Sequence, residues 1–102
     1  MSLRNNLYYI VAQEEGRFTI RFDANHPIFQ GHFPGHPVVP GACLIQIAEE
    51  LAGTLAGRTV HFTSLRNVKF RQPVTPDTEL TITINNDKIE IDPYMCASAD
   101  VQ

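Results

Sequence analysis

Three histidines mark a stretch of the chain whose residue types could move protons. His26 opens this stretch, and His32 and His36 lie within it, among four of the seven prolines and three of the six glycines. Proline fixes φ and glycine permits positive φ, so the segment from Pro27 to Gly41 is predicted to be a loop held in one unusual path. Histidine is the side chain best suited to proton transfer near neutral pH. The loop is therefore predicted to position a general base.

The loop runs directly into the one convincing helical pattern of the chain. Apolar residues recur at i, i+3 and i+4 spacing over about residues 42–56, and Gly57 is a plausible end. The N-terminus of a helix presents unpaired backbone N–H groups and a partial positive charge. A histidine held beside such an end predicts a site that removes a proton and stabilises a growing oxyanion.

The rest of the chain reads as strands that must hold this helix. Residues 7–11 and 17–22 form a predicted hairpin, and residues 80–84, 88–91 and 95–101 are shorter strands with alternating apolar positions. Residues 59–70 are predicted to be one long strand with a bulge near Ser64. Five or six strands and one buried helix predict an α+β fold, in which an antiparallel sheet curls around the helix as a single domain, residues 1–102.

Composition excludes several classes of protein. The net charge of −3 argues against a general nucleic-acid binder, and no apolar run reaches the roughly 18–20 residues that span a bilayer. The N-terminus has no signal-peptide pattern, and Cys43 and Cys96 stand in unrelated contexts that favour reduced thiols, so a cytoplasmic protein is predicted. No ligand spacing indicates a metal, and no glycine-rich phosphate loop indicates a nucleotide cofactor, so none is expected.

Two blocks of sequence resemble a known family. Residues 31–41 read GHFPGHPVVPG and closely resemble the active-site motif of the 3-hydroxyacyl-[acyl-carrier-protein] dehydratases of the FabZ and FabA type, which are hotdog-fold proteins. Residues 67–76 read NVKFRQPVTP and resemble the strand of that family that ends in a Pro-Val-x-Pro turn. The short chain and altered helix are most similar to the dehydratase-like subunits of aryl-polyene-type clusters.

The resemblance implies a role for each matched residue. His32 matches the catalytic histidine that takes the α-proton of the acyl thioester, and the N–H of Gly41 matches the group that binds the thioester carbonyl. The backbone carbonyl of Val38 matches the one that orients the histidine ring. Phe33 and Gly35 belong to the same motif, so the resemblance implies that they bind substrate.

The resemblance also implies an activity and partners. It implies dehydration of a 3-hydroxyacyl thioester to the trans-2-enoyl thioester, in fatty-acid or polyene-type biosynthesis, without a cofactor. The thioester is carried by acyl carrier protein or coenzyme A. The family arrangement is a two-fold homodimer whose site combines the histidine of one subunit with the helix of the other. A larger assembly, or one with another hotdog protein, is the alternative.

The helix departs from the family at the position of its carboxylate. That position is Gln46, and Glu50, one turn later, stands where the family often has glutamine, so the pair is exchanged. Three interpretations stand open. Glu50 acts as the displaced acid, directly or through water or Gln46. Gln46 holds the leaving hydroxyl by its amide while His32 acts as both acid and base. Or the exchange marks an inactive or non-dehydrating relative.

Other features allow other functions. Glu50 could activate water in an acyl thioesterase, and a chain with weak catalysis could bind or scaffold an active hotdog partner. Basic residues that cluster after the helix form either a solvated face or a docking patch for an acidic carrier protein: Arg58, Arg66, Lys69 and Arg71. His26 is predicted to be a structural hydrogen-bonding residue, His36 to be exposed, and His61 to be paired within a strand.

Overall fold

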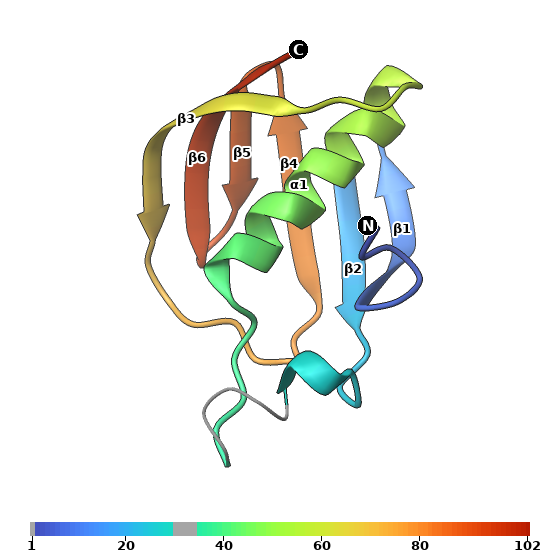
Figure 1. The fold of residues 1–102 in the computed structure, drawn as a ribbon, viewed down its shortest axis with the longest axis vertical. Helices are drawn as coiled ribbons and strands as arrows, with labels where there is room; N and C mark the ends of the chain where they lie inside the picture. Colours follow the sequence, from blue (N-terminus) through green and yellow to red (C-terminus); the bar gives the residue numbers. More distant parts are fainter. Residues whose placement is uncertain (1, 30–34) are drawn as a thin grey trace.

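The chain forms one antiparallel sheet curled around a helix (Figure 1). This computed structural model describes residues 2–29 and 35–102. The strands lie in the order β1-β2-β4-β5-β6-β3, so β1 and β3 are the edges. The elements are β1 (Tyr8–Glu14), β2 (Arg17–Phe22), the 3-10 turn η1 (Pro27–Phe29), α1 (Gly41–Ala56), β3 (Phe62–Phe70), β4 (Leu80–Asn85), β5 (Lys88–Ile91) and β6 (Met95–Val101). The predicted α+β hotdog architecture is confirmed.

Helix α1 crosses the concave face of the sheet and buries the face that its sequence pattern indicated. Its buried residues are Leu44, Ile47, Ala48 and Leu51, four of the apolar residues that predicted the helix. The helix ends as predicted at Gly57, which adopts a left-handed conformation with φ of 70° and whose N–H donates to the carbonyl of Gly53. Around α1, alternate residues of the strands point inward, as in β2 and β6.

The strand predicted from Thr59 begins three residues late, at Phe62. Thr59 and His61 are exposed, but Val60 is only 5% exposed, because this segment crosses the end of α1 and places Val60 in the core. The N–H of Phe62 donates to the carboxylate of Glu49 at 2.8 Å. His61 therefore lies one residue before the strand, so its predicted place within the strand was wrong, although its carbonyl does accept the N–H of Gln102 at 3.0 Å.

Strand β3 pairs irregularly with β6. The register shifts between Phe62 and Ser64, which confirms the predicted bulge. A second shift, which was not predicted, lies between Arg66 and Lys69, where Asn67 has φ of 55°. These bulges bend the edge strand around α1.

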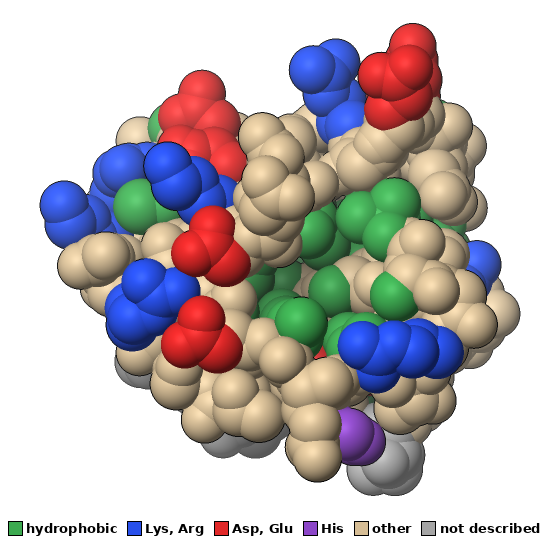
Figure 2. Space-filling view, turned by 90° about the horizontal axis from the view of Figure 1, so that it is seen from above, with side chains coloured by type: hydrophobic (Ala, Val, Ile, Leu, Met, Phe, Trp, Pro, Cys, Tyr) green, Lys and Arg blue, Asp and Glu red, His purple; other side chains and the backbone are tan. Residues whose placement is uncertain are grey.

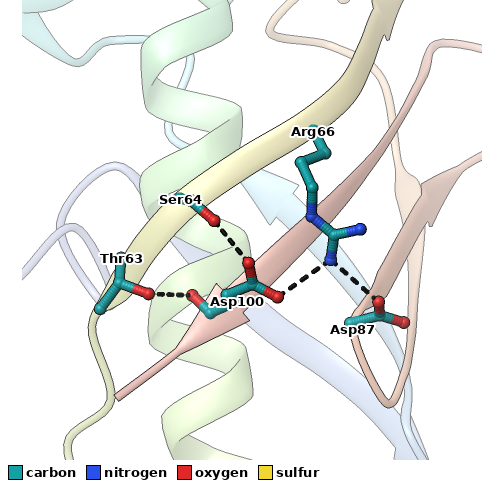
Figure 3. A network of polar contacts seen from close by, with 5 residues as sticks. All are labelled: Thr63, Ser64, Arg66, Asp87 and Asp100. Atoms are coloured by element: carbon teal, nitrogen blue, oxygen red, sulfur yellow. Dashed lines mark hydrogen bonds and ion pairs between the residues drawn. The ribbon is translucent and has the colours of Figure 1, made fainter.

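A polar network fastens β3 to its neighbours (Figure 3). The guanidinium of Arg66 donates to Asp87, in the β4–β5 turn, at 3.1 Å and to Asp100, in β6, at 2.9 Å. Ser64 donates to Asp100 at 2.6 Å, and the hydroxyl of Thr63 donates to the Asp100 carbonyl at 3.2 Å. Because these groups are exposed, each pair stabilises the fold little, but together they fix the register of the edge strand.

The end of the molecule at which α1 stops is open. Figure 2 looks onto this end, where apolar side chains gather in a hollow beneath charged residues. The hollow has a volume of about 270 Å³ and an apolar lining of Ala52, Leu55, Ala56, Val60, Ile84 and Val101. It lies at the opposite end of α1 from the loop that the sequence marks as the candidate site (Figure 1).

The packing of α1 predicts unequal costs for two leucine truncations. Leu51 is fully buried and Leu55 is 42% exposed on the same helix. Leu51→Ala should lower the free energy of unfolding by about 2–5 kcal/mol, because it leaves a cavity in the core. Leu55→Ala should cost about 1 kcal/mol or less. Urea unfolding of both variants checks this, and equal losses would contradict the assignment of the buried face.

Candidate active site

The second half of the histidine-containing loop is anchored to the other family-like block. The N–H of Val39 donates to the carbonyl of Val74 at 2.7 Å, and both side chains are buried. Gly35 has φ of 84°, a left-handed conformation that favours glycine. His32 and Phe33 lie outside the described residues, so their roles stay predictions. The anchoring explains why the two motifs occur together, because one holds the other in place.

The loop delivers the chain to an uncapped helix N-terminus. The carbonyl of Pro40 accepts the N–H groups of Cys43 and Leu44, and no side chain among the described residues caps the helix. The N–H groups of Gly41 and Ala42 have no acceptor within the helix, as at every helix start. No acidic residue lies in the first turn, so no side-chain charge there offsets the positive end of the dipole. This end can therefore stabilise a negative oxygen.

Phe70 lies against the helix start, a contact that the sequence did not reveal. A Cβ on Gly41 would come within 2.8 Å of the Phe70 Cζ atom, so the ring occupies the space that a side chain would need. Phe70 is 53% exposed at the end of β3. Gly41, Phe70 and Val38, which is half-buried, line one cavity of about 370 Å³. Position 70 lies three residues before the Pro-Val-x-Pro turn, within the second family-like block, and that was the only available signal.

Glu50 is the centre of a hydrogen-bonding network that ties the N-terminus to α1. One carboxylate oxygen, Oε2, accepts the N–H of Leu3 at 2.8 Å and Nε2 of Gln46 at 3.2 Å. The other, Oε1, accepts the N–H of Arg4 at 3.0 Å, the hydroxyl of Tyr8 at 3.0 Å and the hydroxyl of Ser2 at 3.2 Å. Gln46 and Glu50 therefore lie together, as the exchanged pair predicted. The network's other members were not predicted.

Tyr8 is the buried member of this network. Its side chain has no exposed surface, although its hydroxyl reaches Glu50. Burial raises the pKa of the Tyr8 phenol well above its ordinary value, and the hydrogen bond to Glu50 and the charge of Glu50 raise it further, while Arg4 lowers it slightly. The Tyr8 hydroxyl therefore keeps its proton and donates to the carboxylate even above the pH at which tyrosine ordinarily ionises. The sequence showed Tyr8 only as a residue of a β-rich run.

The predicted site residues line separate cavities in one chain. Val38 and Gly41 line the cavity beside Phe70, whereas Gln46 and Glu50 line one of about 600 Å³ with Ser2 and Arg4. Gln46 also lines a hollow of about 430 Å³ between α1 and the first half of β3. Gly41 and the Gln46–Glu50 pair thus line different cavities of the described chain, although Ala42, in the first turn of α1, shares the hollow of about 430 Å³ with Gln46.

Of the remaining histidines, His26 and His36 have the environments predicted for them, whereas His61 does not lie within a strand. His26 Nδ1 accepts the N–H of Ile28 at 3.1 Å, so its predicted structural role is supported. His36 is exposed, as predicted. Among residues 2–29 and 35–102, no group of three His, Cys, Asp or Glu side chains is placed to hold a metal ion. Within those same ranges, no helix has both the length and the apolar character needed to cross a bilayer.

Three of the four residues in the predicted basic patch donate hydrogen bonds to other parts of the chain. Arg66 is paired with two aspartates, and Arg58 donates to the carbonyls of Thr59 and Gln102. Arg71 donates to the Sγ atom of Cys96 at 3.3 Å. Lys69 and Arg71 are both exposed and flank Phe70, the last residue of β3. Only this part of the patch adjoins the helix start.

Comparisons with known proteins identify the family to which the chain belongs. The sequence model of the ApeI-like family, described as ApeI dehydratase, matches residues 10–100. A 3-hydroxyacyl-[acyl-carrier-protein] dehydratase FabZ from Geobacter metallireducens is 41% identical over 59% of this chain and 46% of its own length. The FabZ of Campylobacter concisus is 33% identical over 74% of this chain and 68% of its own. The chain spans about half the length of most of the curated relatives it matches.

A solved structure extends the likeness to the fold. The structure of the dehydratase heterocomplex ApeI:P from Xenorhabdus doucetiae matches with a TM-score of 0.69 and 25% identity. The match covers 92% of each chain. The resemblance drawn from the two sequence blocks, including the aryl-polyene-type subgroup, is confirmed by the family model and these relatives.

The environment of Tyr8 predicts an unusual alkaline titration. Tyrosine ordinarily ionises near pH 10, but the raised pKa keeps Tyr8 protonated beyond that point. The tyrosinate absorbance step near pH 10 should therefore be equal in wild type and Tyr8→Phe. A step smaller by one tyrosine in Tyr8→Phe would contradict the assignment. The stability that Tyr8 gains from staying protonated is complete below about pH 10 and falls as the pH rises further.

The contact between Gly41 and Phe70 predicts a local rearrangement. Gly41→Ala should displace the Phe70 ring, because the nearest ring atoms would lie 2.8 and 2.9 Å from the new Cβ. The ring is half exposed, so it can swing aside at little cost in stability. The ring-current shift of the Ala42 amide proton in Gly41→Ala should then approach its value in Phe70→Leu. An unchanged shift in Gly41→Ala would show that the ring does not lie over the helix start.

Proposed function

Since the chain belongs to the ApeI-like family of FabZ-type dehydratases, we propose that it removes water from 3-hydroxyacyl thioesters and forms trans-2-enoyl thioesters. The observation that carries the proposal is the N-terminus of α1, which no side chain caps and which the Val39–Val74 hydrogen bond holds in place. The α-proton of a thioester is only weakly acidic, so the reaction needs a base and a stabilised carbonyl oxygen together.

We propose that His32 takes the α-proton and that the N–H of Gly41 binds the thioester carbonyl. The charge that develops on this oxygen then meets the positive end of the α1 dipole. One such donor typically contributes about 10²–10³ in rate. The carbonyl of Val38 would orient the imidazole, and Phe33 and Gly35 would flank the acyl group.

The leaving hydroxyl needs a proton, and the network around Glu50 bears on its source. The Glu50 carboxylate already accepts from five donors, which suits an acceptor better than an acid. We therefore favour the interpretation in which Gln46 holds the hydroxyl and His32 returns the proton it took. The α-proton leaves with the hydroxyl as water when the C–O bond breaks, so the histidine ends as it began.

A site of this kind requires two chains. Gly41 and the Gln46–Glu50 pair line separate cavities in one chain, and β3 is an edge strand with Leu65 and Phe70 partly exposed. Edge strands with apolar side chains favour pairing. We propose that a second hotdog chain covers this edge and completes the site. A homodimer is the simplest case, and the ApeI:P structure is named as a heterocomplex, which makes a different partner chain the alternative.

The substrate carrier follows from the relatives and from the remaining basic residues. The relatives are named for acyl-carrier-protein substrates, and Lys69 and Arg71 give positive charge beside the helix start. Complementary charge speeds the encounter with an acidic carrier. We propose a carrier-bound substrate, with coenzyme A thioesters as the alternative, and a cytoplasmic reaction in fatty-acid or polyene-type biosynthesis.

The two other functions make different demands on Glu50. A thioesterase would need this carboxylate to take a proton from water, but the N-terminal segment, Tyr8 and Gln46 surround it with donors. A catalytically weak subunit that supports a second hotdog protein is favoured by one observation, the heterocomplex of the similar structure. It would show no turnover alone and full turnover when mixed with its partner.

Kinetics of two histidine variants test the proposal. Wild-type protein should convert 3-hydroxyacyl carrier protein to the enoyl thioester, which absorbs in the ultraviolet. His32→Ala should lower kcat/KM by at least about 10²-fold, the usual contribution of a general base. His36→Ala, an exposed position four residues away, is the matched control and should not change the rate. Equal rates in His32→Ala and wild type, or release of free thiol in place of enoyl product, would overturn the proposal.

A further inference from the structure

The described chain contains a buried tyrosine that the proposed chemistry does not use. The Tyr8 side chain is fully buried, yet its hydroxyl donates its hydrogen bond to Glu50 and not to the backbone of the sheet. Around the same carboxylate, the chain before β1 turns back on itself through hydrogen bonds from Asn6 and Leu7 to the carbonyl of Leu3. This turn points the N–H groups of Leu3 and Arg4 at Glu50.

The turn is held to α1 at a second point. The guanidinium of Arg4 donates to the hydroxyl of Thr54, one turn beyond Glu50 on the helix, at 3.3 Å. Thr54 in turn donates to the carbonyl of Glu50 at 3.2 Å. The N-terminal segment is therefore hydrogen-bonded to the side of α1 that carries Gln46 and Glu50. These hydrogen bonds hold the Glu50 carboxylate in place.

The carboxylate in turn determines how Gln46 is oriented. An ionised carboxylate only accepts hydrogen bonds, whereas an amide has a donor side and an acceptor side. Gln46 can therefore meet Glu50 only with its nitrogen, and Nε2 lies 3.2 Å from Oε2. An amide whose nitrogen is fixed at Glu50 has its oxygen fixed on the opposite side. A rotated amide would set two acceptor oxygens against each other.

We propose that Tyr8 and the N-terminal turn, acting through Glu50, are positioning groups that fix the orientation of the Gln46 amide. The inference rests on the proposed function, in which Gln46 takes the place of the family carboxylate at the leaving hydroxyl. With Nε2 held by Glu50, the amide oxygen lies on the other side, and its two lone pairs allow it to accept the hydrogen bond of the substrate 3-hydroxyl beside another partner. The hydroxyl oxygen is then left to receive the proton that His32 returns. Glu50 positions Gln46 and does not itself donate a proton.

Steady-state kinetics of Glu50→Gln and Tyr8→Phe test the inference. Glu50→Gln should lower kcat about tenfold, because a second amide in place of the carboxylate allows either orientation of Gln46, while KM changes little. Tyr8→Phe keeps the carboxylate and the backbone donors and removes one hydroxyl, so a drop of about twofold to fivefold in kcat is expected. The matched controls are Tyr9→Phe, on the same strand, and Glu79→Gln, which breaks the exposed pair with Arg21. Neither control should change kcat.

The pH dependence of kcat separates positioning from acid catalysis. If Glu50 only positions Gln46, the profile of Glu50→Gln keeps the shape of the wild-type profile at a lower height. Loss of one limb of the profile in Glu50→Gln would show that Glu50 titrates in the reaction, and it would overturn the inference. Wild-type kcat in both Glu50→Gln and Tyr8→Phe would overturn it as well.

A spectroscopic readout keeps the test independent of activity. The side-chain NH₂ signals of Gln46, assigned by their loss in Gln46→Glu, should shift in Tyr8→Phe and Glu50→Gln and stay in place in Tyr9→Phe. If wild-type protein shows no dehydration, the proposed function fails while these signals still report on the network. If the signals stay in place in all variants, the inference fails whatever the activity.

Discussion

A single carboxylate links the N-terminal turn, the first strand and the helix that carries the candidate site. Glu50 receives donors from Ser2, Leu3, Arg4 and Tyr8 on one side and from Gln46 on the other. Charged acceptors form stronger hydrogen bonds than neutral ones, and partial burial strengthens them further. Removing the carboxylate would leave several donors without a partner, so the cost would fall on the fold and on the site together. Glu50 is therefore a structural constraint, and in the proposed mechanism it is a functional one as well.

The exchange of Gln46 and Glu50 relative to the family changes which side chain can carry a proton. A carboxylate at position 46 could carry a proton, whereas the amide there can only accept or donate hydrogen bonds. Moving the charge one turn along α1 places it within reach of the N-terminal segment, which satisfies it with backbone N–H groups. In the proposed mechanism, the charge then supports the reacting centre without taking part in the reaction. That mechanism assigns every proton transfer to the histidine of the loop that is anchored at Val74.

The regular parts of the fold followed from the sequence because local periodicity determines them. Leu44, Ile47 and Leu51 predicted the buried face of α1, and residues 17–22 were predicted to be a strand, whose buried side chains are Phe18, Ile20 and Phe22. The predicted start of β3 was wrong because the segment before Phe62 crosses the end of α1 and buries Val60. This is a tertiary effect that no local pattern encodes. The second bulge, at Asn67, depends on the curl of the whole sheet.

The site was predictable only where its residues are contiguous. The loop and the helix start lie in one stretch, so their chemistry could be inferred from residue types and spacing. Tyr8 and Glu50 are separated by 42 residues, and Gly41 and Phe70 meet only because β3 curls over the helix start. Contacts of this kind depend on the fold, and a single sequence contains no periodic signal for them.

Neutron diffraction from a perdeuterated crystal tests the central claim most directly, since it locates hydrogen atoms at the meeting of Gln46 and Glu50. The account predicts deuterium on the Gln46 side-chain atom that faces Glu50, on the Tyr8 hydroxyl and on the Leu3 and Arg4 backbone nitrogens, with none on either Glu50 oxygen. Deuterium on a Glu50 oxygen, or a Gln46 oxygen turned toward it, would contradict the account.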